Sequence, residues 1–217
     1  MTRIAIVGGH GKVARHLVRD LRRAGHEPVA LVRRESYRHE LEELGAEVRL
    51  LDIERQDADG FAAAFARCAA VVFAAGAGPD GKAERKRTVD LEGSLKSVEG
   101  ARLAGISRFV QVSASGMDEP VPDGATDVWR AYVEAKRDAD AALRASDLDW
   151  TIIRPGVLTD DPATGLVTLA PTVPKADVTR ADVAAVLAAV LDAPRSIRQQ
   201  WDLMGGDTPI TEAVATA

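Results

Sequence analysis

The chain has 217 residues, of which 46% are hydrophobic and 28% are charged, with 33 acidic against 28 basic side chains. This composition suits one well-cored domain over residues 1–217, excludes a largely disordered chain, and argues against nucleic-acid binding, which needs a basic surface. One cysteine cannot form an internal disulfide, no apolar run reaches the length of a membrane span, and the histidines are scattered, so we expect a cytoplasmic protein without a transmembrane helix or a metal site.

Short β-branched runs alternate with longer helical patterns from the first residues onward. Apolar runs of this length, hydrophobic on both faces, are typical of parallel strands that are covered on both sides. The runs that predict strands are Arg3–Val7, Pro28–Val32, Glu47–Leu50, Ala70–Ala75, Arg108–Ser113, Trp150–Arg154 and Gln200–Met204.

Helices are predicted between these strands from periodic apolar residues and capping patterns. In chain order these are Val13, Leu17 and Leu21 before Gly25; a stripe of Leu91, Leu95 and Val98; a helix from Thr126 or Asp127 to about Ser146; and a capping box of Thr179 with Asp182 before a helix ending at Pro194. Repeated β-α-β units predict an α/β fold, a doubly wound and mostly parallel Rossmann sheet with helices on both faces.

The segment Gly156–Ala176 breaks this alternation, because it contains two glycines and three prolines but no helical stripe. We expect residues 156–178 to form a small excursion over the carboxyl edge of the sheet, where ligands bind in such folds. Its apolar residues predict an apolar substrate pocket; they are Leu158, Leu166, Val167 and Leu169.

A glycine-rich loop follows the first predicted strand and opens the first helix. Its pattern is G-x-x-G-x-x-A, which runs Gly8, Gly9, His10, Gly11, Lys12, Val13, Ala14. Glycine permits a positive φ and lets a pyrophosphate approach the backbone, while the helix N-terminus supplies free N–H groups. This context predicts a dinucleotide site, with an ordinary tight turn as the alternative; His10 is given no chemical role.

The end of the second predicted strand indicates which dinucleotide binds. Sites for NAD usually place an acidic residue there to hold the ribose 2′-hydroxyl, whereas this chain has Arg33 and Arg34. Guanidinium groups pair well with a 2′-phosphate, and Lys12 can join them. We therefore favour NADP(H) over NAD(H), although Glu35 follows closely and a solvated charge cluster is the alternative.

Two further segments follow predicted strands and can line the same site. Asp52 can accept a hydrogen bond from the adenine amino group with Ile53 against the ring, or can simply form a turn. Small residues end the fourth strand, as needed where the backbone runs beside a cofactor; they are Ala74, Ala75 and Gly76.

Tyr132 and Lys136 are four residues apart on a predicted helix, so they share one face. A nearby ammonium stabilises the phenolate and lowers the pKa of tyrosine, which makes it a usable proton donor at neutral pH. The same lysine can bind the nicotinamide ribose. The alternative is a tyrosine packed on the sheet and a lysine reaching to water.

Candidate partners of this pair lie at the ends of two strands. Ser113 or Ser115 can hold a substrate carbonyl or a cofactor group. The backbone after the sixth strand can meet the nicotinamide carboxamide, at Pro155, Gly156 and Val157. By contrast, the charged run from Lys82 to Arg87 is expected to be a solvated helix face.

These residues together resemble the short-chain dehydrogenase/reductase superfamily, and within it the atypical NAD(P)H-binding, NmrA-like group. The segments that carry the resemblance are Tyr132–Asp140, Leu148–Gly156 and Thr179–Ala184. The match runs over nearly the whole chain. It implies a Rossmann fold, NADP(H) on the glycine loop, and reduction or oxidation of a small organic substrate.

The resemblance also implies roles for single residues. Tyr132 is the expected proton donor, Lys136 its modulator and ribose contact, and Ser113 or Ser115 the hydroxyl partner. The cofactor is expected on Gly8, Gly11, Lys12, Arg33, Arg34, Asp52, Ala75 and Gly76. Two features depart from the pattern, since the loop ends in Ala14 and the serines precede Tyr132 by more residues than is usual.

Three functions are compatible with this pattern. The first is an NADP(H)-dependent oxidoreductase that acts on a small, apolar carbonyl, quinone or flavin-like substrate. The second is a non-catalytic NADP(H)-binding sensor, because several relatives in the group lack the tyrosine. The third, a nucleotide-sugar epimerase or dehydratase, ranks last because little chain remains for a substrate domain. The sequence identifies neither the substrate nor the oligomeric state.

Overall fold

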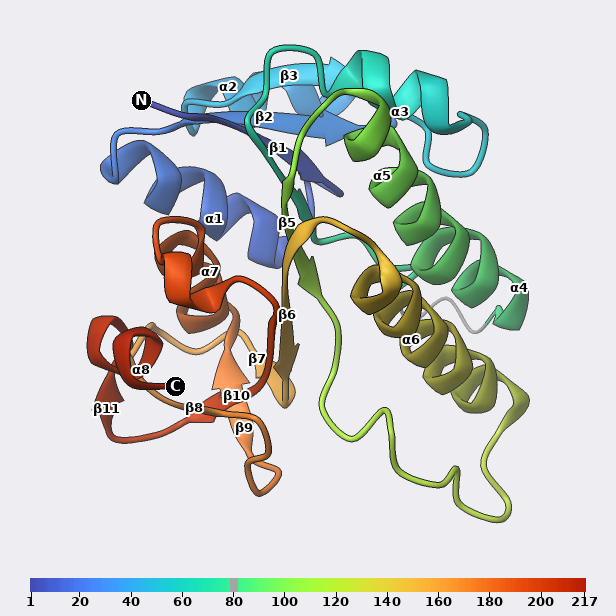
Figure 1. Cartoon of the computed structure of the whole chain (residues 1–217), viewed down its shortest axis with the longest axis vertical. Coiled ribbons are helices and arrows are strands. Elements are labelled where there is room, and N and C mark those ends of the chain that lie inside the picture. Colours follow the sequence, from blue (N-terminus) through green and yellow to red (C-terminus); the bar gives the residue numbers. More distant parts are fainter. Residues whose placement is uncertain (79–81) are drawn as a thin grey trace.

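The computed structural model describes residues 1–78 and 82–217, and its main sheet has nine strands (Figure 1). The sheet order is β11-β8-β10-β6-β5-β4-β1-β2-β3. The strands are β1 (Arg3–Val7), β2 (Glu27–Val32), β3 (Glu47–Leu50), β4 (Ala70–Phe73), β5 (Arg108–Val112), β6 (Asp149–Pro155), β8 (Leu166–Ala170), β10 (Gln199–Gly205) and β11 (Thr208–Pro209). β7 (Val157–Thr159) pairs in parallel with β9 (Asp177–Thr179) in a separate two-stranded sheet.

Seven neighbouring strands of the sheet run parallel to one another, in the order β3-β2-β1-β4-β5-β6-β10. The direction in which strands are added along the chain reverses beside β1. This reversal is the topological switch point at which doubly wound sheets bind ligands. The predicted α/β Rossmann fold is confirmed, and all seven predicted strands are present, two with the predicted bounds and five with ends that differ by one or two residues.

Helices cover both faces of the sheet, as Figure 1 shows. One face packs against α1 (Lys12–Arg23), α2 (Arg38–Glu43), α7 (Arg180–Leu191) and α8 (Ile210–Thr216). The other face packs against α3 (Ala58–Ala64), α5 (Glu92–Leu103) and α6 (Asp127–Ala145), with the short α4 (Ala83–Arg85) ahead of α5. Alternate residues of β1 enter the two cores, Ile4 and Ile6 on one side and Ala5 and Val7 on the other. Among the residues that the structure describes, the helices are too short or too polar to span a membrane.

The segment after β6, predicted to be an excursion over the sheet edge, is partly built into the sheet, because β8 pairs antiparallel with β10. Its side chains alternate, so that Val167 and Leu169 enter the core formed with α7 and α8. The prediction that Val167 and Leu169 line the substrate pocket is therefore wrong. Leu158 packs against the same core, and Leu166 is exposed. Both ends of the segment, next to Pro155 and next to Lys175, line the larger of the two cavities described below.

Helix α5 packs through small residues and not through its leucines. Its buried face is formed by Gly93, Ser94, Ser97, Gly100 and Ala101. Leu95 is 39% exposed, so the predicted Leu91–Leu95–Val98 stripe is wrong at this position, whereas Val98 packs against the core as predicted. Small side chains allow the close approach, since a Cβ on Gly100 would lie 2.6 Å from the Phe61 Cβ. A π-helical stretch, Lys86–Leu91, precedes α5 and changes the angular position of every following residue.

Candidate functional site

The glycine loop turns the chain from β1 into α1 at the switch point. Gly8 has φ +82°, and a Cβ there would lie 2.7 Å from the Ala75 Cα. Gly9 donates its N–H to the Leu31 carbonyl at 3.0 Å, and a Cβ there would lie 2.8 Å from the Ala30 Cβ. These two glycines are therefore required by the fold itself, because the loop is pressed against β2 and the segment after β4.

Gly11 is different, because its backbone is extended with φ −60° and the atom nearest to a Cβ would be the Gly8 carbonyl oxygen at 3.2 Å. Gly11 is the N-cap of α1, where no side chain accepts from the free N–H groups and no acidic residue occupies the first turn. By contrast, hydroxyl side chains cap α6 and α7. The N-terminus of α1 thus keeps its donors and its positive dipole end available, which fits a pyrophosphate.

A cavity of about 330 Å³ opens beside this loop, and we call it the cofactor cavity. Nine of the predicted cofactor residues line it: Gly8, His10, Gly11, Arg33, Asp52, Ile53, Ala74, Ala75 and Gly76. Gly9, Lys12, Val13 and Arg34 are outside its lining. Tyr37, Glu54 and Arg85 line it as well, although the sequence did not single them out. The cavity brings together the carboxyl ends of β1 and β2 with the segments after β3 and β4.

Stacked rings form one wall at the β2 end of the cofactor cavity. His10 and Tyr37 lie face to face with centroids 3.7 Å apart, and the Arg34 guanidinium donates to the Tyr37 hydroxyl at 3.3 Å. Glu40 holds the His10 ring at 3.0 Å. Arg33 and Arg34 are both exposed, so their charged groups can turn toward a phosphate. The Lys12 ammonium pairs with Asp160, which follows β7.

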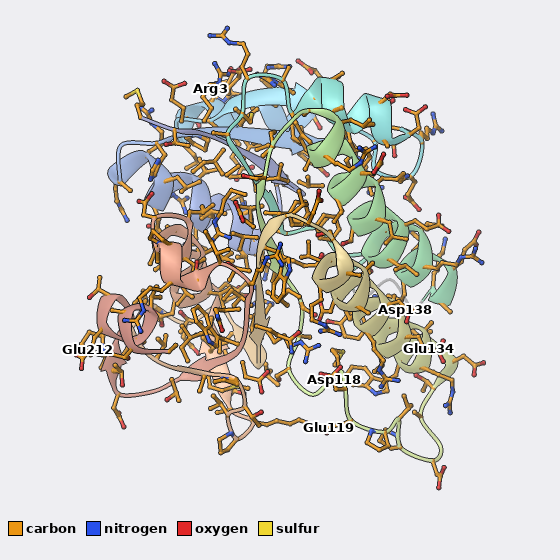
Figure 2. All side chains as sticks on the ribbon, viewed as in Figure 1. Arg3, Asp118, Glu119, Glu134, Asp138 and Glu212 are labelled. Atoms are coloured by element: carbon orange, nitrogen blue, oxygen red, sulfur yellow. The ribbon has the colours of Figure 1, made fainter. Side chains whose placement is uncertain are left out.

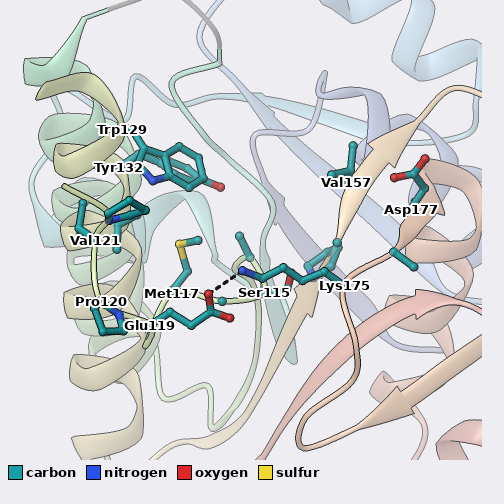
Figure 3. Close-up of a pocket in the computed structure, with 17 residues that line it drawn as sticks. Ser115, Met117, Glu119, Pro120, Val121, Trp129, Tyr132, Val157, Lys175 and Asp177 are labelled. Carbon is teal, nitrogen blue, oxygen red and sulfur yellow. Dashed lines mark hydrogen bonds and ion pairs between the residues drawn. The ribbon is translucent and has the colours of Figure 1, made fainter. Parts of the chain in front are cut away.

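A second cavity, of about 420 Å³, lies between the start of α6, the loop before it and the segment after β6, and we call it the substrate cavity (Figure 3). Trp129 and Tyr132 form one wall with ring centroids 5.5 Å apart. The Tyr132 hydroxyl points into the space in Figure 3, and Ser115 lies across from it. The remaining predicted residues that line this cavity are Pro155, Gly156 and Val157.

Lys136 is buried behind Tyr132, with its Nζ 6.0 Å from the centre of the ring. Burial raises the pKa of Tyr132 above its ordinary value near 10, and the ammonium of Lys136 offsets this only in part. The predicted lowering of the Tyr132 pKa is therefore wrong. Burial by itself lowers the pKa of Lys136, but its interactions with Tyr132 and with the carboxylates of Asp90 and Asp140 reverse the direction and keep this lysine protonated.

Two residues of the pre-α5 stretch complete this site, and the sequence did not identify them. Asp90 is 2% exposed; it accepts the Ala77 N–H at 3.0 Å and pairs with the Lys136 Nζ at 3.5 Å. It thereby ties Lys136 to the loop that lines the cofactor cavity. Lys86 is also buried and lies 5.5 Å from the Tyr132 ring centre, so the predicted solvated face is wrong at this position. The π-helical stretch turns both residues inward, which a helical repeat of 3.6 does not foresee.

The two candidate serines have different surroundings. Ser113 is buried and donates to the Asp140 carboxylate at 2.8 Å, in a network that also holds Gln111 and Arg154. Ser115 lies on the substrate cavity, and its backbone N–H donates to Pro155. Ser115 is therefore the hydroxyl that can reach a bound molecule.

The arrangement can perform general acid chemistry beside a bound dinucleotide. One cavity has an uncapped helix N-terminus and cationic side chains for phosphates. The other has a phenol and a hydroxyl in apolar surroundings. Between the two lies the protonated Lys136. Tyr132 can give a proton to an oxygen in the substrate cavity, and Lys136 can stabilise the charge left on the ring.

Comparison with known proteins agrees with this geometry. The family model described as NAD(P)H-binding matches residues 8–194. A solved structure described as "Putative NAD-dependent epimerase/dehydratase from Bacillus halodurans" is 41% identical, covers 100% of both chains and superposes with a TM-score of 0.92. The "Uncharacterized sugar epimerase YhfK" of Bacillus subtilis is 36% identical over 98% of both chains. The anaerobilin reductase ChuY of Escherichia coli O157:H7 is 27% identical, covering 95% of this chain and 98% of its own, with a TM-score of 0.77.

Proposed function

The chain belongs to the NAD(P)H-binding family, and on that premise we propose that it is an NADP(H)-dependent oxidoreductase acting on a small, apolar carbonyl, quinone or flavin-like substrate. The observation that carries the proposal is the Tyr132 hydroxyl in an apolar cavity, backed by a buried and protonated Lys136. A protein that only sensed the cofactor would need no acid in this place. The reductase among the structural neighbours supports the same class of reaction.

Each residue of the site has a proposed role. NADPH, when bound, supplies the hydride. Gly11 and the first turn of α1 hold the pyrophosphate, and Arg33 and Arg34 hold the 2′-phosphate. Tyr132 gives the proton to the substrate oxygen, while Ser115 orients that oxygen by a hydrogen bond. Lys136 stabilises the developing phenolate, and Asp90 keeps Lys136 in place between the two cavities.

The cofactor preference is the first expected result. Wild-type protein should bind NADPH about tenfold more tightly than NADH, because each charge-assisted bond from an exposed arginine to the 2′-phosphate adds on the order of 1 kcal/mol. Replacing Arg33 and Arg34 by alanine should remove this preference and leave NADH affinity nearly unchanged. Titration of both cofactors by tryptophan fluorescence measures this. Equal affinities in the wild type would contradict the assignment.

The pH dependence is the second expected result, and its sign follows from the raised pKa of Tyr132. Reduction needs the phenol form, which persists throughout neutral pH because burial raises the pKa of Tyr132 above that of a free tyrosine. The value of kcat/KM for reduction should therefore be flat from about pH 6 to 9 and fall only in more alkaline solution. The reverse oxidation needs the phenolate and should accelerate as pH rises. A fall in reduction rate around pH 7 would assign the proton to another group.

An epimerase is the second candidate, because two highly similar relatives are described as epimerases. The substrate cavity favours reduction instead. Its walls are mostly apolar, including Met117, Val121 and Trp129, whereas a sugar needs many hydrogen-bond partners.

The experiment that tests the function is a substrate panel with NADPH. Quinones, flavins, aldehydes and ketones are followed by loss of NADPH absorbance, and nucleotide sugars are followed by interconversion of their epimers. Consumption of NADPH with at least one apolar acceptor is expected. Epimer interconversion without net NADPH consumption would replace the oxidoreductase by the epimerase.

A further inference from the structure

The loop between β5 and α6, residues 113–126, forms much of the substrate cavity. Eight of the 17 residues that line the cavity belong to it: Ala114, Ser115, Gly116, Met117, Glu119, Pro120, Val121 and Pro122. Within residues 114–122, Asp118 is the residue that does not line the cavity. The shape of the cavity therefore depends on how this loop is held.

Two arginines hold the middle of the loop from behind. Arg137, on α6, donates to the carbonyls of Met117 and Glu119 at 2.9 and 3.0 Å. Arg154, at the end of β6, donates to the Asp118 carboxylate at 2.6 Å. On the cavity side Glu119 pairs with Lys175 at 2.6 Å, drawn as a dashed line in Figure 3. Asp118 and Glu119 are labelled on this loop in Figure 2.

The anchor of Arg154 lies in the core. Its Nε donates to Asp140 at 2.9 Å, and Asp140 is 0% exposed. The same carboxylate also accepts from Gln111 at 2.7 Å and from Ser113 at 2.8 Å, so its oxygens are well satisfied. Arg154 is 4% exposed and is held rigidly by this network, because a planar guanidinium with two fixed bonds has little freedom.

We propose that Arg154 is a positioning residue. Its bond to the buried Asp140 fixes its guanidinium, and the guanidinium holds Asp118, so that the loop wall of the substrate cavity stays in one position. Lysine could not replace it, because one ammonium cannot reach two carboxylates in a fixed fork. The pairing also holds the pKa of the Asp118 carboxyl below its usual range. The proposal rests on the proposed function only in that the occupant of the cavity is taken to be the substrate.

The decisive variant is Asp118→Asn, because the Asp118 side chain is 58% exposed and its replacement leaves the core intact. Hydrogen–deuterium exchange should show amides of residues 116–124 exchanging about fivefold faster, the effect of losing one partly exposed ion pair. With 2-methyl-1,4-naphthoquinone as the probe, KM should rise about fivefold. The values of kcat and of NADPH affinity should stay nearly unchanged, because Tyr132 and Lys136 lie on α6 and not on the loop that the substitution loosens.

The matched control is Asp123→Asn, an exposed carboxylate of the same loop that does not line the cavity. Asp118→Glu keeps the charge and should recover most of the wild-type KM. Arg154→Lys should reproduce the Asp118→Asn effect, and the double variant should add little more, because both changes break the same link.

The outcomes separate the two proposals. If Asp118→Asn leaves loop exchange and KM at wild-type values, Arg154 does not position the loop. If Asp118→Asn and Asp123→Asn give equal changes, the changes come from the loss of one negative charge on the loop and not from the loss of the bond to Arg154. That outcome also overturns the proposal. If wild-type protein does not reduce the probe or any member of the panel, the proposed function fails, and the exchange of the loop alone decides the role of Arg154.

Discussion

Tyr132→Phe is expected to lower kcat by about 10²–10⁴-fold, the contribution typical of a positioned general acid. Phenylalanine keeps the ring beside Trp129 and between Lys86 and Lys136, so the walls of the cavity stay in place. It removes only the hydroxyl that faces the substrate cavity. NADPH affinity should stay nearly unchanged, because Tyr132 lines the substrate cavity and not the cofactor cavity. Steady-state kinetics and cofactor titration measure the two effects separately.

The matched control is Tyr37→Phe, the same chemical change in the other tyrosine of the chain. Tyr37 lies at the β2 end of the cofactor cavity and bonds Arg34, so its loss should change cofactor affinity slightly and kcat hardly at all. Wild-type turnover in Tyr132→Phe would mean that the substrate takes its proton from water, as quinones and flavins can. If no acceptor is reduced and NADPH instead alters the affinity for a protein partner, the sensor function replaces the enzyme.

Gly11→Val should weaken NADPH binding by at least about 100-fold, or roughly 2.7 kcal/mol. The valine side chain would occupy the space beside the α1 N-terminus in which a pyrophosphate must approach the backbone. Thermal stability of the cofactor-free protein should fall only modestly, because Gly11 has a negative φ and the nearest obstacle is the Gly8 carbonyl oxygen at 3.2 Å. Calorimetric titration and thermal unfolding of the same preparations test both statements.

Two further variants serve as controls for Gly11→Val. Ala24→Val places the same side chain at the exposed C-terminal end of α1 and should leave binding unchanged. Gly8→Val should instead reduce stability as well as binding, because φ is +82° and a Cβ would meet the Ala75 backbone. Normal NADPH affinity in Gly11→Val would show that the loop is only a tight turn.

Much of the fold could be predicted from local patterns. Apolar runs such as Ile4–Val7 become strands wherever both faces are covered, and Thr126 and Thr179 cap their helices as expected. The glycine loop and the Tyr132–Lys136 pair could be located for the same reason, since each lies within a single turn or helix. The cofactor cavity confirms that the loop and the ends of β2, β3 and β4 meet, because parallel strands bring their carboxyl ends to one edge.

Other features depended on contacts between distant segments, which local patterns do not contain. The alternating residues of β8 enter the core only because β10 lies beside them, and the sequence alone could equally place them around a ligand. The π-helical stretch brings Lys86 and Asp90 to Tyr132, and the direction of the Tyr132 pKa follows from burial that the spacing to Lys136 cannot reveal. The link from Asp140 through Arg154 to Asp118 joins a helix, a strand and a loop. Local patterns were enough to locate the seven main strands, the glycine loop and the Tyr132–Lys136 pair, because each lies within a single segment. The burial of charged side chains against one another, and with it the way the site is held, follows from tertiary packing.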